Sequence, residues 1–194
     1  MHVREFIEKF YPEYYSIEHY PADKTAAFCK IDQEWGIFSN FGHSSLMVGG
    51  VPFDTSERLF QVMKFKDEAS RKAVYTKKGN PKMTAKHFEK EGMVRPDWGS
   101  IIVDAMKFCL MEKYLQCEEF RLELERSRGL FIVEDQTTFT KKNPDTWGAK
   151  LSDDGTEFVG PNLMGRLLME LRDYGKLDYK LPDDATSFQD LANL

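Results

Sequence analysis

The sequence predicts a single α+β domain in which helices dominate and the β-sheet is small. Long stretches place apolar residues at helical spacing, whereas the strand-like stretches are few and short. A chain of 194 residues can bury one sizeable core, and it is too short for two large domains. We expect residues 28–175 to form this domain, with an N-terminal extension at 1–27 and an acidic tail at 176–194.

The first part of the chain is predicted to hold a short helix and two strands. The extension is aromatic and mixed in charge, so we expect it to pack onto the domain as a short helix. Phe28–Phe41 is predicted to be a strand followed by a turn. Met47–Phe53 is predicted to be a second strand, because Gly49-Gly50 marks a tight turn.

The rest of the chain is predicted to be mostly helical. A break at Lys77–Pro81 separates the first helix from the next, and Gly129 closes the fourth. A short strand is expected at Leu130–Glu134, and a surface loop at Lys141–Gly160, which is rich in Asp, Asn, Pro and Gly. The helices are expected at residues 55–65, 82–91, 99–116, about 118–127 and 163–174.

The helix predicted at Thr55–Phe65 carries a narrow polar stripe on an otherwise apolar surface. Glu57, Gln61 and Lys64 are spaced i, i+4 and i+7, so they share one face, which Glu68 would extend. Apolar residues on the other faces are typical of a buried helix. The stripe then faces either a strip of solvent or a pocket. In a pocket, its carboxylate and amine would equip it for acid–base or imine chemistry.

The same stripe has a purely structural interpretation. Asp54 at the N-cap and Glu57 at the third helical position would form a capping box. Lys64 and Glu68 would be an ordinary surface ion pair. Periodicity alone favours this interpretation.

Composition excludes several classes of protein. Hydrophobic residues make up 41% and aromatic residues 13% of the chain, which excludes a mainly disordered protein. No apolar run approaches the length of about 20 residues that spans a membrane, so we expect no membrane partner. The net charge of −5 gives no global attraction to nucleic acid. Such a contact would need a local patch, for which the candidates are Arg71, Lys72, Lys77, Lys78 and Lys82.

The cysteines and histidines do not predict a metal site. Cys29, Cys109 and Cys117 lack the spacing of metal ligands, and the four histidines are scattered. An odd number of cysteines, together with an N-terminus that lacks the apolar run of a signal peptide, suits a reducing cytoplasm. We expect a cytoplasmic protein whose reaction needs neither a metal nor a cofactor.

Four groups of segments are spread over roughly residues 28–174: Gly36–Phe41; Ser56–Gln61 with Lys64-Phe65; Arg95–Trp98 with Met106 and Lys113–Gln116; and Asp145–Gly148 with Gly160–Gly165 and Leu168–Arg172. In their order and spacing, these segments together resemble the NADAR superfamily, also called YbiA-like proteins. Three residues depart from the family pattern. Arg58 and Leu59 stand where the family usually has His and Tyr, which bears on substrate identity more than on chemistry, and Ala149 is the third.

The resemblance implies an N-glycosidase that cleaves the bond between ribose C1′ and an exocyclic amino group of a base. We expect the substrate to be a small phosphorylated ribosylamine, most of all a phosphoribosylaminouracil-type intermediate of riboflavin synthesis. One alternative is a hydrolase of ADP-ribosyl-guanine on nucleic acid. A second alternative is a nucleotide-sugar-binding module without catalysis. The sequence leaves open the substrate, the oligomeric state and the role of both terminal extensions.

The resemblance also implies the catalytic residues. Lys64 is the expected nucleophile, attacking C1′ to form an imine, because burial favours the reactive uncharged form of an amine. Glu57 is the expected general acid and base. A competing route uses carboxylates alone, with Glu57 stabilising an oxocarbenium-like ribose and Asp145 guiding water. The sequence leaves both routes open.

The expected substrate-binding residues each have a structural alternative. Trp98 and Trp147 would stack on the base, or they plug the core from its rim. Asn162 would contact substrate or act as an N-cap, and Asp145 would do so or shape a turn. The full expected set is Ser39, Asn40, Gln61, Trp98, Glu134, Asp145, Trp147, Gly148 and Asn162.

Overall fold

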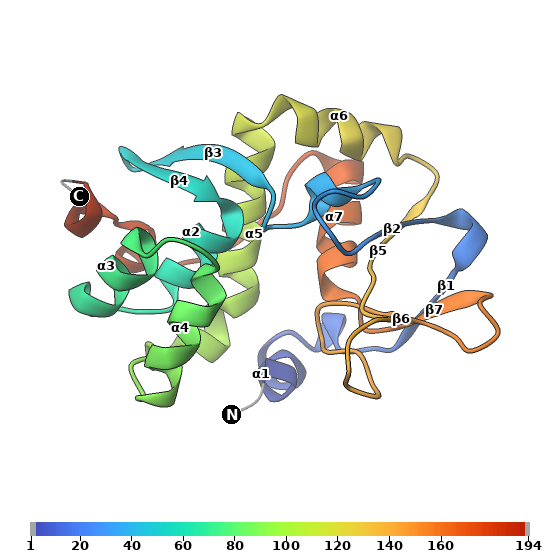
Figure 1. The fold of residues 1–194 in the computed structure, drawn as a ribbon, viewed down its shortest axis with the longest axis horizontal. Helices are drawn as coiled ribbons and strands as arrows, with labels where there is room; N and C mark the ends of the chain where they lie inside the picture. The colour runs from blue at the N-terminus through green and yellow to red at the C-terminus, as the bar shows by residue number, and fades with distance from the viewer. Residues whose placement is uncertain (1–2, 193–194) are drawn as a thin grey trace. The chain divides into compact units, whose positions relative to one another are not determined.

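The computed structural model describes residues 3–192, which divide into two compact units. Unit 1 holds the chain up to Ser39 and Glu119–Leu177, and unit 2 holds Asn40–Glu118 and the chain from Asp178. Both units combine helices with short strands (Figure 1), so the predicted helix-dominated α+β class is confirmed. The described strands form three small sheets rather than the one that the sequence predicts.

Unit 1 is built on two of these sheets. In the first, β1 and β6 both pair antiparallel with β7, and in the second β2 runs parallel to β5, against which α7 packs. Tyr20, Val133, Ala149 and Phe158 form a core cluster here. The elements are α1 (Val3–Phe10), η1 (Pro12–Tyr14), β1 (Glu18–Pro21), η2 (Ala22–Lys24), β2 (Thr25–Phe28), η3 (Gly36–Phe38), α6 (Glu118–Arg126), β5 (Phe131–Glu134), β6 (Lys150–Leu151), β7 (Glu157–Gly160) and α7 (Leu163–Tyr174).

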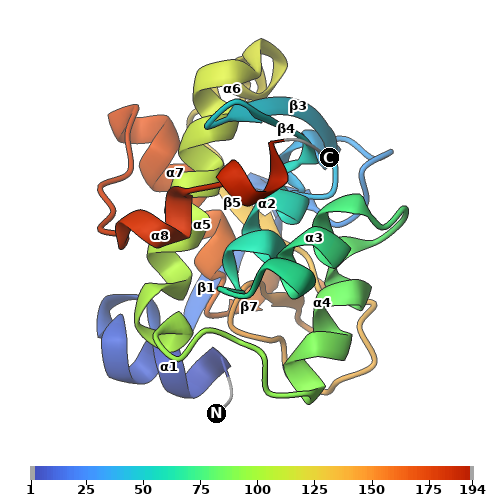
Figure 2. The same ribbon diagram turned by 90° about the vertical axis from the view of Figure 1, so that its left-hand side faces the viewer.

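Unit 2 is a group of helices beside one antiparallel hairpin. The hairpin pairs β3 with β4, and it turns at Gly49 and Gly50, which both have positive φ. Helix α2 packs against α3, α4 and α5 (Figure 2), so all of its residues are buried. The elements are β3 (His43–Val48), β4 (Val51–Thr55), α2 (Ser56–Met63), α3 (Glu68–Thr76), α4 (Pro81–Lys90), α5 (Trp98–Gln116), α8 (Asp183–Thr186) and η4 (Gln189–Leu191).

Several predicted elements differ from the observed ones. The strand expected over Phe28–Phe41 lies earlier, at β2, and a 3-10 turn follows at η3. The extension forms the predicted helix, and it also supplies β1, whose register places Tyr20 opposite Phe158. The loop predicted at Lys141–Gly160 contains β6 and β7, because short strands with polar neighbours resemble loops in sequence.

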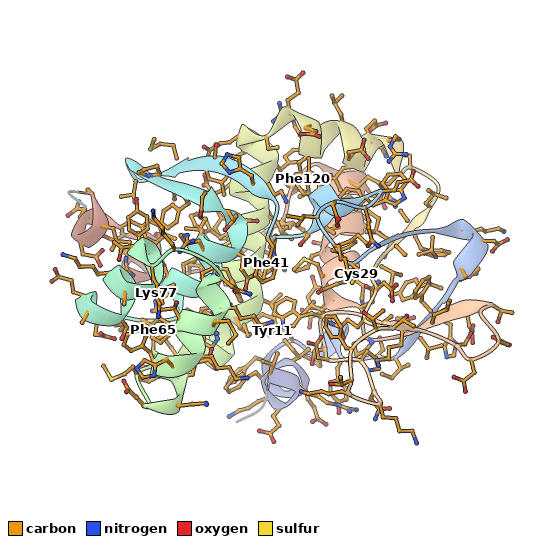
Figure 3. All side chains as sticks on the ribbon, in the orientation of Figure 1. Tyr11, Cys29, Phe41, Phe65, Lys77 and Phe120 are labelled. Atoms are coloured by element: carbon orange, nitrogen blue, oxygen red, sulfur yellow. The ribbon has the colours of Figure 1, made fainter. Side chains whose placement is uncertain are left out.

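The helix that carries the polar stripe is shorter than predicted. It ends at Met63, and the chain then makes a β-bridge between Phe65, which is buried (Figure 3), and Val94. Glu68 belongs to α3, a separate helix whose N-cap is Asp67. Glu68 therefore does not extend the stripe.

Among residues 3–192, no helix is long and apolar enough to cross a membrane.

Candidate functional site

The start of α2 is fixed by residues on both sides of it. The Thr55 hydroxyl accepts a hydrogen bond from the backbone N–H of Arg58 at 3.1 Å, so Thr55 is the N-cap. The predicted capping box is wrong, because Asp54 instead accepts a hydrogen bond from Nε of Arg58 at 2.6 Å. The N–H of Glu57 donates to the carbonyl of Asn40 at 2.9 Å. These contacts set the helical turn from which the Glu57 side chain extends.

Glu57 is a buried carboxyl with one amide neighbour. Only 6% of the residue is exposed, and its Oε1 accepts a hydrogen bond from Nε2 of Gln61 at 2.8 Å. Burial raises the pKa of the Glu57 carboxyl, while the Gln61 hydrogen bond and the charges of Lys82 and Lys64 oppose that rise. A carboxyl with a raised pKa can hold a proton at higher pH and release it to a leaving group.

Gln61, the hydrogen-bond partner of Glu57, has a buried amide oxygen. The residue is 2% exposed, and its Oε1 has no hydrogen-bond partner among the described residues. A buried acceptor without a partner costs about 1–3 kcal/mol. A hydroxyl or amine of a bound ligand would satisfy it.

Lys64 sits at the C-cap of α2 and contacts two side chains. Its Nζ lies 2.5 Å from Oε1 of Glu89 and 5.8 Å from the ring centroid of Trp98. The predicted pairing with Glu68 is therefore wrong, because Glu68 lies on α3. Because Nζ donates a hydrogen bond to Glu89, the Lys64–Glu89 pair must open before this amine can attack carbon.

Trp98 is more buried than a ligand-stacking residue needs to be. It is 5% exposed, and its ring lies 5.2 Å from that of Phe60. The backbone N–H of Trp98 donates to the carbonyl of Arg95 at 3.1 Å, and Trp98 is the first residue of α5. This burial favours the core-packing alternative, although the Lys64 amine lies over the ring.

Ser39 and Asn40 are held by the protein itself. Asn40 uses its Nδ2 toward Sδ of Met106 at 3.1 Å, and its Oδ1 accepts a hydrogen bond from the Ser56 hydroxyl at 2.9 Å. The N–H of Ser39 donates to Gly36 at 3.0 Å. These contacts favour a structural role for both residues in a turn, in which Asn40 positions α2.

In unit 1, Asp145 shapes the turn that leads to Trp147. Its Oδ1 accepts hydrogen bonds from Nε2 of Gln136 at 2.5 Å and from the N–H of Trp147 at 2.9 Å. Gln136 is buried, and its Oε1 accepts from the N–H of Asp145 at 2.8 Å. Trp147 itself is half-buried.

Asn162 and Gly148 both lie against the backbone of β5. Oδ1 of Asn162 accepts from the N–H of Glu134 at 3.1 Å, and its Nδ2 donates to the carbonyl of Ile132 at 2.8 Å. Asn162 stands at the N-cap of α7 with φ of 49°, and its side chain makes no cap hydrogen bond. A Cβ on Gly148 would lie 2.4 Å from the Glu134 carbonyl oxygen, so only glycine fits there. The side chain of Asn162 thus binds the backbone of β5.

Two hollows lie beside these residues, one in each unit. A hollow of about 380 Å³ in unit 1 is lined by residues 138–141 with Asn143 and Asp145. A hollow of about 640 Å³ in unit 2 is lined by β3, β4, Arg58 and the loop at Lys77–Gly79 (Figure 3 labels Lys77). Glu57, Gln61 and Lys64 line neither hollow, whereas Arg58, the residue after Glu57, lines the larger one.

Sequence reasoning missed several residues that hold this arrangement. Arg58 donates to the carbonyls of Val74, Lys77 and Gly79 at 2.8, 3.0 and 3.1 Å, so it anchors the loop after α3. Arg71, expected in a basic patch, is instead buried in an ion pair with Asp190. These partners lie far apart in sequence, so periodicity could not reveal them. The lysines of the expected basic patch are exposed.

The described residues contain no group of three or more His, Cys, Asp and Glu side chains that could hold a metal ion.

Lys113, fully buried on α5, should make stability depend on pH. Burial lowers its pKa from 10.5 to about 7. Between these values the unfolded chain holds a proton that the folded chain has released, so the free energy of unfolding rises with pH, by up to about 1.4 kcal/mol per pH unit. Lys113→Met should remove this rise in urea denaturation curves recorded from pH 7 to 10.5. An unchanged slope in the variant would contradict the assignment.

Comparisons with known proteins agree on one family. A family model described as "NADAR domain" matches residues 27–174. The N-glycosidase YbiA of Escherichia coli is 31% identical over 158 residues, which cover 81% of this chain and 92% of that protein. An N-glycosidase of Nostoc punctiforme is 25% identical over 152 residues, covering 77% and 91% respectively.

A third relative is longer than this chain. It is a riboflavin biosynthesis protein of Vibrio vulnificus, 28% identical over 168 residues, which cover 86% of this chain and 42% of that protein. The NMR structure of the Escherichia coli protein YbiA matches this fold with a TM-score of 0.61 at 30% identity, covering 78% of this chain and 84% of that one.

Proposed function

Because this chain belongs to the NADAR domain family, we propose that it is an N-glycosidase that cleaves the bond between ribose C1′ and an exocyclic amino group of a base. Relatives named as N-glycosidases support the hydrolysis of N-glycosidic bonds. The observation that carries the proposal is the buried Glu57 carboxyl, whose pKa burial raises. Such a group can protonate a departing amine.

The proposed substrate is a phosphoribosylaminouracil-type intermediate of riboflavin synthesis. The name of the Vibrio vulnificus relative supports this class. The net charge of −5 supports a small substrate over a long polyanion. In such a compound the glycosidic nitrogen is exocyclic, so the ribose ring can open to an imine at C1′.

In the proposed reaction, Lys64 attacks that imine. Its Nζ adds to C1′, the base amine leaves with a proton from Glu57, and a lysine imine remains on the sugar. Water then adds to C1′ and releases the sugar, which returns the amine to Lys64. In the alternative route, the ionised Glu57 stabilises an oxocarbenium-like ribose until water adds to C1′.

The direct test is base release by the purified protein. It is incubated with a phosphoribosylaminouracil and, separately, with an oligonucleotide that carries ADP-ribosyl-guanine, and the products are separated by chromatography. We expect free aminouracil and ribose phosphate from the first. Release of ADP-ribose alone would favour the alternative substrate, for which the exposed Lys77, Lys78 and Lys82 are the supporting observation. Binding without release from either would indicate a non-catalytic module.

Activity should survive treatment with a chelator. The proposed chemistry uses only an amine and carboxyls, so EDTA followed by gel filtration should leave the initial rate unchanged. A loss of rate that zinc or magnesium restores would contradict it.

The two tryptophans should differ when truncated. Trp147→Ala should weaken substrate binding by about 1–3 kcal/mol if the indole stacks on the base. Trp98→Ala should in addition lower the free energy of unfolding by about 3–5 kcal/mol, because the ring is buried against Phe60. Calorimetric titration and thermal melts measure the two effects. Normal binding by both variants would show that neither ring stacks on substrate.

A further inference from the structure

The segment that follows the family match is part of the unit that carries Glu57 and Lys64. The match ends at residue 174, yet Ala185, Phe188 and Leu191 are buried. The Phe188 ring lies 5.2 Å from that of Phe53 on β4. This part of the predicted tail therefore belongs to the core of unit 2.

Two aspartates of this segment neutralise buried arginines. Arg95 has two carboxylate partners. Asp97 accepts hydrogen bonds from its Nε and Nη2 at 2.7 and 2.9 Å, and Asp184 accepts from its Nη2 at 3.2 and 3.3 Å. Asp190 accepts from Nε and Nη2 of Arg71 at 2.7 and 3.0 Å. The Arg95 side chain has no exposed surface and that of Arg71 has 4%. A guanidinium buried to this extent needs carboxylate partners to offset the cost of its desolvation.

Both arginines donate a hydrogen bond to the backbone of Lys64-Phe65. The N–H of Arg95 donates to the carbonyl of Lys64 at 3.0 Å, and the carbonyl of Arg95 accepts from the N–H of Trp98 at 3.1 Å. Nη1 of Arg71 donates to the carbonyl of Phe65 at 3.5 Å. The Lys64-Phe65 backbone thus contacts two arginines. The C-terminal segment balances the charge of Arg71 through Asp190 and shares that of Arg95 with Asp97.

We propose that Asp184 and Asp190 are positioning residues for the Lys64–Trp98 pair. Asp184, together with Asp97, orients Arg95, which fixes the carbonyl of Lys64 and the turn into Trp98. Asp190 acts in the same way through Arg71 on Phe65. The inference rests on the proposed function for its kinetic consequence, whereas the placement of Trp98 is testable without any activity.

The test compares Asp184→Asn, Asp190→Asn and the double variant with Asp183→Asn. Asp183 is exposed in the same segment, and its change alters the charge equally. The chain has three tryptophans, so Trp35→Phe with Trp147→Phe leaves Trp98 as the only one. In that background, acrylamide quenching of fluorescence measures the access of solvent to Trp98. Steady-state kinetics and thermal melts are measured with all tryptophans present.

We expect Asp184→Asn to increase the quenching of Trp98 and to lower kcat about tenfold with little change in KM, because a displacement near 1 Å at a reacting group lowers rates strongly. The double variant should show larger effects, Asp184→Glu should recover part of the rate, and the control should match the parent. Quenching and kcat that equal those of the control, even with a lower Tm, would overturn the proposal. If the parent shows no activity, the proposed function fails, while the quenching result still decides the positioning role.

Discussion

Replacing Glu57 by Gln should abolish turnover and leave the protein folded. The Glu57 side chain is the buried acid of the proposed reaction, and general acid–base catalysis contributes roughly a hundred- to ten-thousand-fold to a rate. Gln keeps the size of the side chain and an oxygen that can accept the Gln61 hydrogen bond. The helix start should survive, because Thr55 supplies the N-cap and the backbone N–H of residue 57 binds Asn40. The measurements are kcat/KM and the Tm of the purified variant.

Glu112 provides a matched control for this change. Its Oε2 accepts a hydrogen bond from Nε2 of Gln116 at 2.7 Å, four residues on, as Glu57 accepts one from Gln61. Burial also raises the pKa of the Glu112 carboxyl. Glu112→Gln should keep kcat/KM within about twofold, since it lies outside the proposed site. Full activity in Glu57→Gln would remove Glu57 from the mechanism.

The burial of α2 was predictable, but its ends were not. Apolar residues on most of its faces require neighbours on all sides, and α3, α4 and α5 supply them. Asp54 and Thr55 are both good N-cap residues, so local sequence could not choose between them. The choice depends on Arg58, whose guanidinium binds Asp54 and the loop after α3. That contact spans about twenty residues.

The partner of Lys64 illustrates the same limit. Helical spacing gives neighbours three and four residues away, whereas Glu89 lies on α4, which is separated from Lys64 in the chain by the whole of α3. Likewise, the ion pair between Asp184 and Arg95 joins a weakly patterned segment to a motif 89 residues earlier. Sequence patterns identified which residues are polar in apolar surroundings. The tertiary fold decides which of them meet.

Two of the polar residues expected to bind substrate have hydrogen-bond partners within the protein. Asn40 and Asn162 are turn-prone residues in family motifs, and both use their side-chain amides on groups of the protein. Their amides shape the backbone near Glu57 and near Glu134. A role in contact with substrate stays a prediction for both, as it does for Ser39, Gly148 and Glu134.

Borohydride added during turnover should trap the sugar on Lys64. If Nζ of Lys64 forms an imine with C1′, reduction converts it into a stable secondary amine that peptide mass spectrometry locates. Lys64→Arg should neither react nor turn over substrate, because a guanidinium stays protonated and cannot form this imine. It keeps the positive charge opposite Glu89, so binding should persist. Lys66→Arg is the matched control two residues away, and it should retain both rate and adduct.

Glu89 supplies an independent test of the same step. Its carboxylate, 2.5 Å from Nζ of Lys64, holds the amine in an ion pair that must open before Nζ can reach carbon. Glu89→Gln removes that charge, so the initial rate of adduct formation should increase if Lys64 is the nucleophile. An unchanged rate, full activity in Lys64→Arg, or an adduct on another residue would transfer the reaction to the carboxylate route. Glu57 would then stabilise the developing charge on ribose, and Lys64 would serve only to balance Glu89 beside Trp98.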